Sequence, residues 1–234
     1  MSIYGDICHS EGPPPPEYFL HHAILAPRNI DVQQMNQKIL DRLPGEELVY
    51  HSANSVEREG CPAASHDDTP EDFLHALEPS SLPLSELKMK IGCPLMLLRN
   101  LDPSKGLCNG THMILLNAYR RILEVLIIGG DHHGEKAFIP RITLKPSSRQ
   151  YAFTLKRCQF PVRLSFAMTI NKAQGQSLKY VSLHLLSSIF CHGQLYVALS
   201  RATSSRNVHV LLPETPTGLQ RKTANVVYPE VLID

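Results

Sequence analysis

The chain has 234 residues, a formal net charge of +1 and 43% hydrophobic residues, which is enough for one good core or for one core with a small satellite domain. No apolar run reaches the roughly 18 residues that a membrane-spanning helix needs. The N-terminus shows no basic segment followed by an apolar stretch, so we expect neither a membrane protein nor a secreted one.

The first part of the chain predicts one α/β unit. Residues 1–20 carry the run Pro13–Pro16 and predict a proline-rich linker or a ragged N-terminus. The apolar segment 22–27 predicts a short strand, and Asn29 is a good N-cap for a helix that ends at Leu43-Pro44-Gly45. A strand, a capped turn and a helix in this order are typical of α/β folds.

The middle of the chain changes from helical to strand-like patterning. Residues 45–68 are polar and predict irregular structure, and Thr69-Pro-Glu-Asp72 then predicts a helix start. Turn signals at Asn109-Gly110 and Gly129-Gly130 separate some of the short apolar runs that follow. These runs predict strands at 91–98, 111–116, 122–128 and 136–144. Several short strands without helices between them predict a small β-barrel or sheet inserted in the α/β body.

The six cysteines are scattered, and none forms a Cys-x-x-Cys pair. This spacing favours reduced thiols in an intracellular protein over a disulfide framework. A structural zinc site using His132-His133, His192 or cysteines is the alternative interpretation. Because paired ligand spacing is absent, we predict no metal site.

Two segments of the last third of the chain belong together. The first, Thr169-Ile-Asn-Lys-Ala-Gln-Gly-Gln-Ser-Leu178, predicts a polar, glycine-containing turn after a strand. The second, Gly193-Gln-Leu-Tyr-Val-Ala-Leu-Ser-Arg-Ala-Thr203, predicts a short amphipathic helix that delivers Arg201 at its end. Strand-like runs lie around them at 162–169, 180–186 and 208–212. Apolar strands alternating with helices and turns are typical of a mostly parallel sheet.

Charge is distributed unevenly along the chain. The segment 136–213 contains eleven Lys or Arg residues and no Asp or Glu, whereas 19 of the 22 acidic residues precede it. This asymmetry favours an anionic partner for the C-terminal part, most simply a phosphate backbone. The alternative is a solvated basic face that the acidic N-terminal part balances in space.

In order and spacing, these segments resemble PIF-type (petite integration frequency) DNA helicases, most closely those encoded by Helitron transposons. The resemblance runs from about His22 to Leu212. Besides the two segments above, three others carry it: Ala23-Ile-Leu-Ala-Pro27, Lys90-Ile-Gly-Cys-Pro-Leu-Met-Leu-Leu-Arg-Asn-Leu-Asp-Pro-Ser-Lys-Gly-Leu-Cys-Asn-Gly110 and Phe153-Thr-Leu-Lys-Arg-Cys-Gln-Phe-Pro-Val162. The family is similar to superfamily 1 helicases, which move 5′ to 3′ on single-stranded DNA with ATP and Mg²⁺ bound between two RecA-like domains.

The resemblance implies an α/β fold of the RecA-like, P-loop NTPase type, with a mostly parallel sheet and an inserted small β-barrel. It implies four regions: a linker at 1–20, a discontinuous second RecA-like domain at 21–87 and 158–213, an accessory β-barrel at 88–157, and a tail at 214–234. It also implies an intracellular protein, nuclear by its family, that acts in genome maintenance or transposition.

The resemblance also implies roles for single residues. Arg201 matches the arginine finger, which stabilises negative charge at the γ-phosphate of ATP during cleavage. The residues expected to couple nucleotide state to DNA binding are Gln174, Gly175, Gln176 and, through a looser match, Arg28. The residues expected near DNA are Thr169, Asn171 and Lys172, together with Arg99, Lys105 and Asn109 in the accessory domain. Hydroxyls, amides and cations of this kind suit a phosphate backbone, although turn or surface roles are the alternative for each of them.

The chain departs from the family pattern in one large respect. An ATP site needs a Gly-x-x-x-x-Gly-Lys-[Ser/Thr] loop, and no Gly-Lys dipeptide occurs in the sequence. We therefore expect ATP and Mg²⁺ to be bound mainly by a missing first RecA-like domain, supplied in cis or in trans. The expected partners are that domain, single-stranded DNA and duplex junctions. The alternatives are a non-enzymatic single-stranded DNA-binding module and a degraded transposon-derived remnant.

Overall fold

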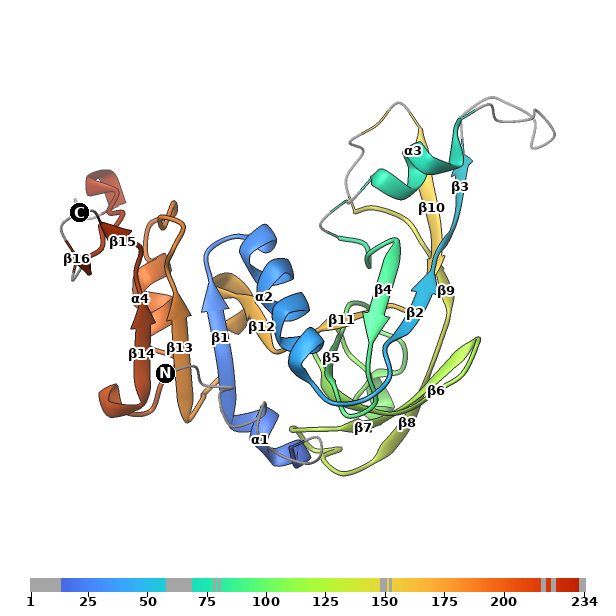
Figure 1. The fold of residues 1–234 in the computed structure, drawn as a ribbon, viewed down its shortest axis with the longest axis horizontal. Coiled ribbons are helices and arrows are strands. Elements are labelled where there is room, and N and C mark those ends of the chain that lie inside the picture. Colours follow the sequence, from blue (N-terminus) through green and yellow to red (C-terminus); the bar gives the residue numbers. More distant parts are fainter. Residues whose placement is uncertain are drawn as a thin grey trace. The chain divides into compact units, whose positions relative to one another are not determined.

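The computed structural model describes residues 14–57, 69–77, 79, 81–147, 151, 153–215, 218–219 and 222–231. The chain forms two compact units (Figure 1). Unit 1 combines Met1–Pro44 with Ser165–Asp234, and unit 2 is Gly45–Leu164. Among the described residues, no helix is both long and apolar enough to cross a membrane.

Unit 1 is built on a four-stranded, wholly parallel sheet with the order β12-β1-β13-β14. Its strands are β1 (His22–Ala26), β12 (Ala167–Thr169), β13 (Tyr180–His184) and β14 (Val208–Leu211). Four of the five residues of β1 are buried, as expected for a central strand of a parallel sheet. The predicted parallel sheet of the α/β body is therefore present in the structure.

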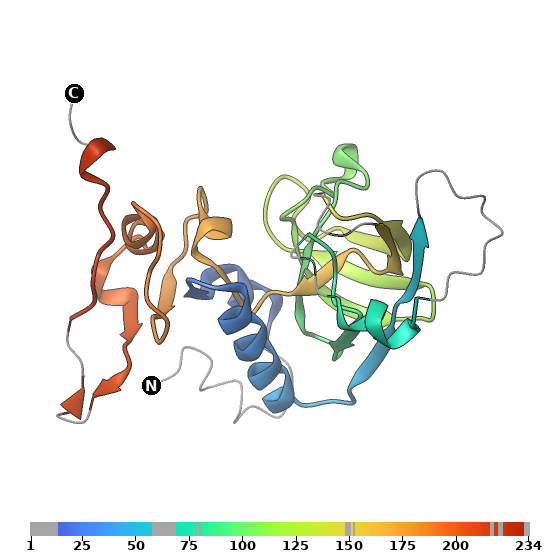
Figure 2. The ribbon, with the colours of Figure 1, turned by 90° about the horizontal axis from the view of Figure 1, so that it is seen from above.

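Helix α2 (Asn29–Arg42) covers one face of this sheet, and the 3₁₀ turn η3 (Ile170–Ala173) with helix α4 (Gln194–Leu199) covers the other (Figure 2). Unit 1 also contains α1 (Pro16–His21) and the 3₁₀ turns η4 (Ser205–Asn207) and η5 (Pro229–Val231). A short hairpin, β15 (Glu214–Thr215) and β16 (Gly218–Leu219), follows β14. Helix α2 packs on β12, where the buried Asn36 amide donates to the carbonyl of Ala167 at 3.1 Å and accepts from its N–H at 2.8 Å.

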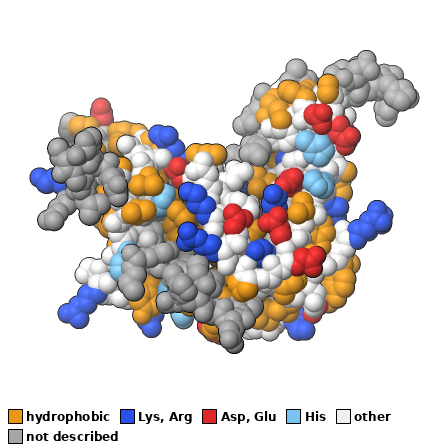
Figure 3. All heavy atoms as spheres, in the orientation of Figure 1, with side chains coloured by type: hydrophobic (Ala, Val, Ile, Leu, Met, Phe, Trp, Pro, Cys, Tyr) orange, Lys and Arg blue, Asp and Glu red, His pale blue; other side chains and the backbone are white. Residues whose placement is uncertain are grey.

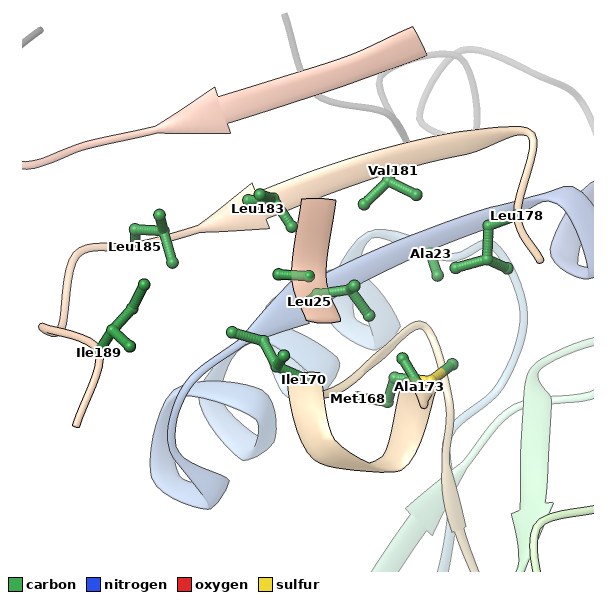
Figure 4. Packing of buried hydrophobic residues seen from close by; sticks show 11 residues of the cluster. Ala23, Leu25, Met168, Ile170, Ala173, Leu178, Val181, Leu183, Leu185 and Ile189 are labelled. Atoms are coloured by element: carbon green, nitrogen blue, oxygen red, sulfur yellow. The ribbon is translucent and has the colours of Figure 1, made fainter. Parts of the chain in front are cut away.

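The other face of the sheet forms the apolar core of unit 1 (Figure 4). Alternate residues of β1 and β13 point into it, in the period of two that strands impose. Residues from η3 and α4 complete it, including Ile170, Ala173 and Ala198, each 0% exposed. The two predicted motif segments are thus held on one side of the sheet by the same core.

Unit 2 is built from antiparallel sheets. Their orders are β11-β5-β6-β7-β8, β3-β10-β9 and β2-β4. The strands are β2 (Leu48–His51), β3 (Ala53–Glu57), β4 (Glu86–Met89), β5 (Pro94–Leu97), β6 (His112–Ala118), β7 (Ile122–Ile127), β8 (Lys136–Pro140), β9 (Ile142–Leu144), β10 (Thr154–Gln159) and β11 (Val162–Leu164), with helix α3 (Glu71–Ala76) and the 3₁₀ turn η2 (Pro103–Lys105). The expected turn glycines have positive φ, +94° at Gly110 and +96° at Gly129, which glycine adopts without a steric penalty.

A fully buried arginine ties the helical segment of unit 2 to its sheet. Arg157 on β10 is 0% exposed. Its guanidinium donates to the carbonyls of Pro83 (3.1 Å), Leu74 (3.0 Å) and Leu77 (2.8 Å), and to the side-chain oxygen of Asn54 (2.9 Å). These contacts satisfy buried and partly buried backbone carbonyls around α3 and before β4.

The four described cysteines, Cys93, Cys108, Cys158 and Cys191, are free thiols. Burial raises the pKa of Cys93 to about 12. This thiol therefore behaves as a small apolar core residue rather than as a nucleophile.

Two segments differ in local structure from what the sequence predicts. Helix α1 occupies part of the predicted linker, because Pro16 suits the first turn of a helix and Phe19 is buried; the predicted linker residues 1–13 lie outside the described residues. Strands β2 and β3 occupy part of the segment 45–68 that the sequence predicts as irregular. Neither strand has a buried residue: β2 is a short, mostly apolar run of four residues, and β3 is mostly polar, so their sequences give only weak strand signals.

The two units also divide the chain at other positions than expected. The sequence assigns 45–87 and 158–164 to the RecA-like domain, whereas the structure includes both in unit 2. The reason is strand pairing: β3 pairs with β10, β2 with β4, and β11 with β5. Pairs of this kind join distant segments and leave no local signal in the sequence.

Candidate nucleotide and nucleic-acid site

The first motif begins where strand β12 ends at Thr169 and continues directly into η3. Ile170 and Ala173 point into the core, each 0% exposed. Asn171 and Lys172 are exposed on the other side of the turn. The apolar and polar residues of η3 thus separate by face, and the turn presents an amide and an ammonium group outward on a rigid base.

The residues after η3 form a tight turn. Gln176 donates its backbone N–H to the carbonyl of Ala173 at 3.1 Å, and Gly175 has φ +84°. A β-carbon at Gly175 would meet nothing within 4 Å, so glycine is needed here for its backbone conformation rather than for space. Gln174 and Gly175 are exposed, and Gln176 is half-buried.

The second motif forms α4, which begins after Gly193 in the left-handed conformation and ends at Leu199. The guanidinium of Arg201 folds back along this helix. It donates to the carbonyls of Val197 at 3.0 Å and Gln176 at 3.1 Å, and to the hydroxyl of Ser200 at 2.9 Å. Three of its five N–H donors are used in this way among the described residues, which leaves two for an anion.

Backbone hydrogen bonds join the two motifs as well. Leu178 donates to the carbonyl of Arg201 at 2.9 Å and accepts from the N–H of Thr203 at 3.2 Å. Leu178 and Ala202 form a parallel bridge, two residues before β13 begins and six residues before β14 begins. The arginine and the glycine-containing turn are therefore two parts of one structure, although 25 residues separate Gln176 from Arg201.

Arg28 follows strand β1, which pairs with the strand β12 that ends at Thr169. Ala26, at the end of β1, pairs with Thr169, at the end of β12, and Arg28 follows Ala26 by two residues. Because the strands are parallel, both chain segments leave the sheet at the same edge. Arg28 is exposed and is the residue before α2, whose first turn also carries Asp31. The amino end of a helix favours bound anions.

The structure brings further polar residues to this edge that the sequence does not single out. Asp31 accepts from the hydroxyl of Ser187 at 3.1 Å, and its second carboxylate oxygen is buried without a partner among the described residues. Burial lowers the pKa of His184, at the end of β13, and the nearby Asp31 carboxylate opposes that shift. In the sequence, the one signal of these contacts is the position of Asp31 in the first turn of a predicted helix.

The expected DNA residues of unit 2 are used in different ways. Arg99 is half-buried and donates to the carbonyls of Ser81 at 3.1 Å and Lys145 at 3.3 Å, so its guanidinium holds loops together. Lys105 is 75% exposed and lies 3.3 Å from the Asp102 carboxylate. Asn109 is exposed, and its backbone N–H is bound by Asn100 at 2.7 Å.

A complete ATP–Mg²⁺ site does not fit the residues that the structure describes. Within them, no group of three or more His, Cys, Asp or Glu side chains lies together in a way that could hold a metal ion. Asp31 stands with Ser187 and His184 and lacks a second carboxylate.

Comparison with known proteins identifies the class of protein to which this chain is similar. The family model "DNA helicase Pif1, 2B domain" matches residues 72–117. The ATP-dependent DNA helicase PIF1 of Rattus norvegicus is 34% identical over 185 residues, which is 77% of this chain and 26% of the rat protein. The chain thus spans about a quarter of the length of that relative.

Solved structures of Pif1 helicases are similar to this chain as well. A structure of two coordinating Pif1 helicases at forked duplex DNA has a TM-score of 0.60 and 26% identity, covering 82% of this chain and 39% of that one. Bacteroides Pif1 bound to single-stranded DNA has a TM-score of 0.58 and 25% identity, covering 81% and 40%. The fold is the α/β fold of RecA-like helicase domains. The chain belongs to the PIF1-type helicases, of which it represents part of the length.

Proposed function

We propose that this chain is the C-terminal RecA-like part of an ATP-dependent 5′–3′ DNA helicase, which supplies an arginine finger and part of the DNA track. The observation that carries the proposal is the hydrogen bond from Arg201 to the Gln176 carbonyl. It links the residue suited to sense a phosphate with the turn that follows the DNA-facing residues.

In this proposal Arg201 acts on ATP held by another RecA-like domain. Its guanidinium carries a permanent charge, and its two remaining donors match the oxygens of a phosphoryl group. The bonds to Val197 and Gln176 fix its position before ATP arrives. A change at the γ-phosphate would then move Gln176 and, through the tight turn at Gly175, the η3 turn.

The DNA contacts in the proposal are to the backbone. Thr169, Asn171 and Lys172 offer a hydroxyl, an amide and a cation at the edge where parallel strands end. Such groups bind phosphate and sugar without reading sequence. This suits a motor that must move along any strand. Nuclear location and roles in genome maintenance or transposition belong to the same proposal.

The test is reconstitution with a first RecA-like domain of a PIF1-type helicase, added in trans. We expect ATP hydrolysis that depends on single-stranded DNA only when both parts are present. Arg201→Ala is expected to lower the rate by about 10³–10⁵-fold, and Arg201→Lys to restore little of it. Arg206→Ala, which alters an exposed arginine in η4, is the matched control and should leave the rate unchanged.

A non-enzymatic DNA-binding module is the second candidate, favoured by the basic segment 136–213. It predicts salt-dependent binding of single-stranded DNA by the chain alone, weakened by Asn171→Ala with Lys172→Ala. It also predicts that the added domain produces no ATP hydrolysis. That outcome, with a folded chain, would contradict the helicase proposal and support the binding module.

A further inference from the structure

The outer face of the sheet β6-β7-β8 in unit 2 carries exposed apolar side chains where an antiparallel sheet normally shows polar ones. Phe138 is 61% exposed, Tyr119 56% and Ile122 42%. The inner face of the same strands is fully buried at Leu123 and Ile139, each 0% exposed. The sheet thus has one face on the core of its unit and a second apolar face that the described residues leave uncovered.

Strand register places these exposed side chains next to one another. Tyr119 donates its backbone N–H to Ile122 at 2.9 Å, and Ile122 pairs with Pro140. Phe138 lies two residues from Pro140 on β8, so it points to the same side. Directly opposite side chains lie about 4.5–5.5 Å apart on adjacent antiparallel strands. Tyr119, Ile122, Pro140 and Phe138 therefore form one surface, here called the aromatic face.

The acidic group on this surface is neutralised. Glu124 pairs with Phe138 in the register and is 13% exposed. Its carboxylate accepts from Asn117 at 2.8 Å and from the Lys136 ammonium at 3.0 Å. Both hydrogen bonds, the one from Asn117 first, hold its pKa below the usual value. The aromatic face therefore presents no exposed negative charge of its own to an approaching anion.

Two arginines stand at the turn beside the aromatic face. Arg120 and Arg121 connect Tyr119 to Ile122, and both are exposed. Neither makes an ion pair with any acidic side chain in the described ranges. Elsewhere on unit 2, acidic and basic side chains are interspersed on the face that Figure 3 draws. Two adjacent arginines without a described acidic partner thus mark this turn as attractive to anions.

We propose that the aromatic face binds single-stranded nucleic acid, with bases stacked on Tyr119 and Phe138 and phosphates held by Arg120 and Arg121. Exposed aromatic rings on an antiparallel sheet stack bases of any sequence, and adjacent cations track the backbone. An apolar protein partner would use the same rings, but it would leave the unpaired arginines without a role. The inference rests on the proposed function for the identity of the polymer, and it adds a DNA contact in unit 2.

The experiment measures binding of a fluorescein-labelled oligothymidylate to the full chain. Tyr119→Ala with Phe138→Ala is expected to weaken binding about tenfold or more, because each stacked base contributes at that scale. Tyr119→Phe with Phe138→Tyr keeps both rings and should bind as the original does. Ile122→Ala, an exposed apolar residue of the same face without a ring, is the matched control and should change affinity little.

Two further measurements distinguish base stacking from nonspecific binding. An abasic oligonucleotide should bind the ring-deleted variant and the original chain equally. Arg120→Ala with Arg121→Ala should reduce the salt slope of log Kd by about 1.4, at about 0.7 per phosphate of a single strand. Ring deletion that leaves oligothymidylate affinity unchanged, or that weakens abasic binding equally, would overturn the proposal.

A 5-iodouracil oligonucleotide distinguishes this proposal from the proposed function. We expect photo-crosslinks at Tyr119 and Phe138 that persist in the variant Asn171→Ala with Lys172→Ala. Crosslinks confined to unit 1 would overturn the aromatic face and leave the helicase proposal intact. Ring-dependent binding by a chain that gives no ATP hydrolysis with the added domain would support the aromatic face and contradict the helicase proposal.

Discussion

The polar residues of the η3 turn in unit 1 and three arginines of unit 2 are placed in different ways. In unit 1, the motif residues Asn171 and Lys172 are exposed on a turn whose apolar residues face the core. In unit 2, Arg157 is fully buried among backbone carbonyls, and Arg99 and Arg141 also donate to carbonyl oxygens. Lys172 of unit 1 thus faces outward, whereas these three arginines of unit 2 hold backbone segments of their unit together.

This comparison changes how the basic segment 136–213 is interpreted. Lys145 and Lys156 both lie against the Glu57 carboxylate, at 2.6 Å and 3.0 Å. Arg157 reaches no solvent at all. The eleven positive charges therefore do not form one continuous surface for DNA. The count along the sequence overstates the number of cations that a phosphate backbone can meet.

The largest effect on stability is expected for Arg157→Met. The linear side chain fills part of the same volume, but it leaves the carbonyls of Leu74, Leu77 and Pro83 without their donor. We expect the free energy of unfolding to fall by about 3–5 kcal/mol, measured by urea unfolding followed by circular dichroism. Hydrogen exchange in α3 should accelerate with it.

The neighbouring residue provides the control. Lys156→Met removes a partly exposed cation whose ion pair with Glu57 should contribute at most about 1 kcal/mol. Equal losses for the two variants would mean that the buried position of Arg157 gives it no special weight, and the contrast between the units would fail.

In unit 1 the corresponding buried polar side chain is Asn36. Asn36→Ala removes two hydrogen bonds to the backbone of Ala167. Because that N–H and carbonyl are buried under α2, we expect a loss of about 2–3 kcal/mol in the free energy of unfolding. Gln37→Ala, an exposed amide on the same helix that bonds Asp41 at 2.7 Å, should cost less than about 0.5 kcal/mol. If both variants lost a similar free energy of unfolding, the Asn36 hydrogen bonds would not be what holds α2 against β12.

The smallest effect concerns pH. Burial lowers the pKa of His112 in unit 2 and of His184 in unit 1. As pH falls below about 6.5, the unfolded chain takes up protons that the folded chain resists, so stability is complete above that pH and declines below it. The slope for each histidine is at most about 1.4 kcal/mol per pH unit.

Thermal unfolding at pH 7.5 and 5.5 measures this dependence of stability on pH. His112→Gln should reduce the difference between the two midpoints, whereas His209→Gln, on the exposed side of β14, should not. A pH dependence that is unaltered in both variants would assign the acid sensitivity to other groups.

The strands with apolar patterns could be predicted from the sequence, because burial on one or both faces leaves a period that is visible locally. The short strand β2 and the polar strand β3 could not, since they pair with the distant strands β4 and β10. Helix α2 was predicted from Asn29, yet the helix begins at Asn29 itself and Arg28 is the preceding residue, without a side-chain cap. Propensity thus predicts the helix but misplaces its first residue by one position.

The candidate site likewise has features that the sequence predicts and features that only the structure shows. The roles assigned to Arg201 and to the segment after Thr169 come from motifs, and they remain predictions. The bond between Arg201 and Gln176, the pairing of Asp31 with Ser187 and the structural use of Arg99 depend on chain segments that meet only in three dimensions. No pattern in the sequence encodes those distances.

The central position of β1 has a consequence for the order of folding. Its two neighbours, β12 and β13, begin at residues 167 and 180, so β1 stays without a partner strand until most of the chain has been synthesised. Unit 2, whose residues 45–164 are continuous, can complete its contacts earlier on the ribosome. The high sequence separation within the parallel sheet predicts that unit 1 is the slower part to fold. During that interval the apolar strand β1 is exposed to aggregation.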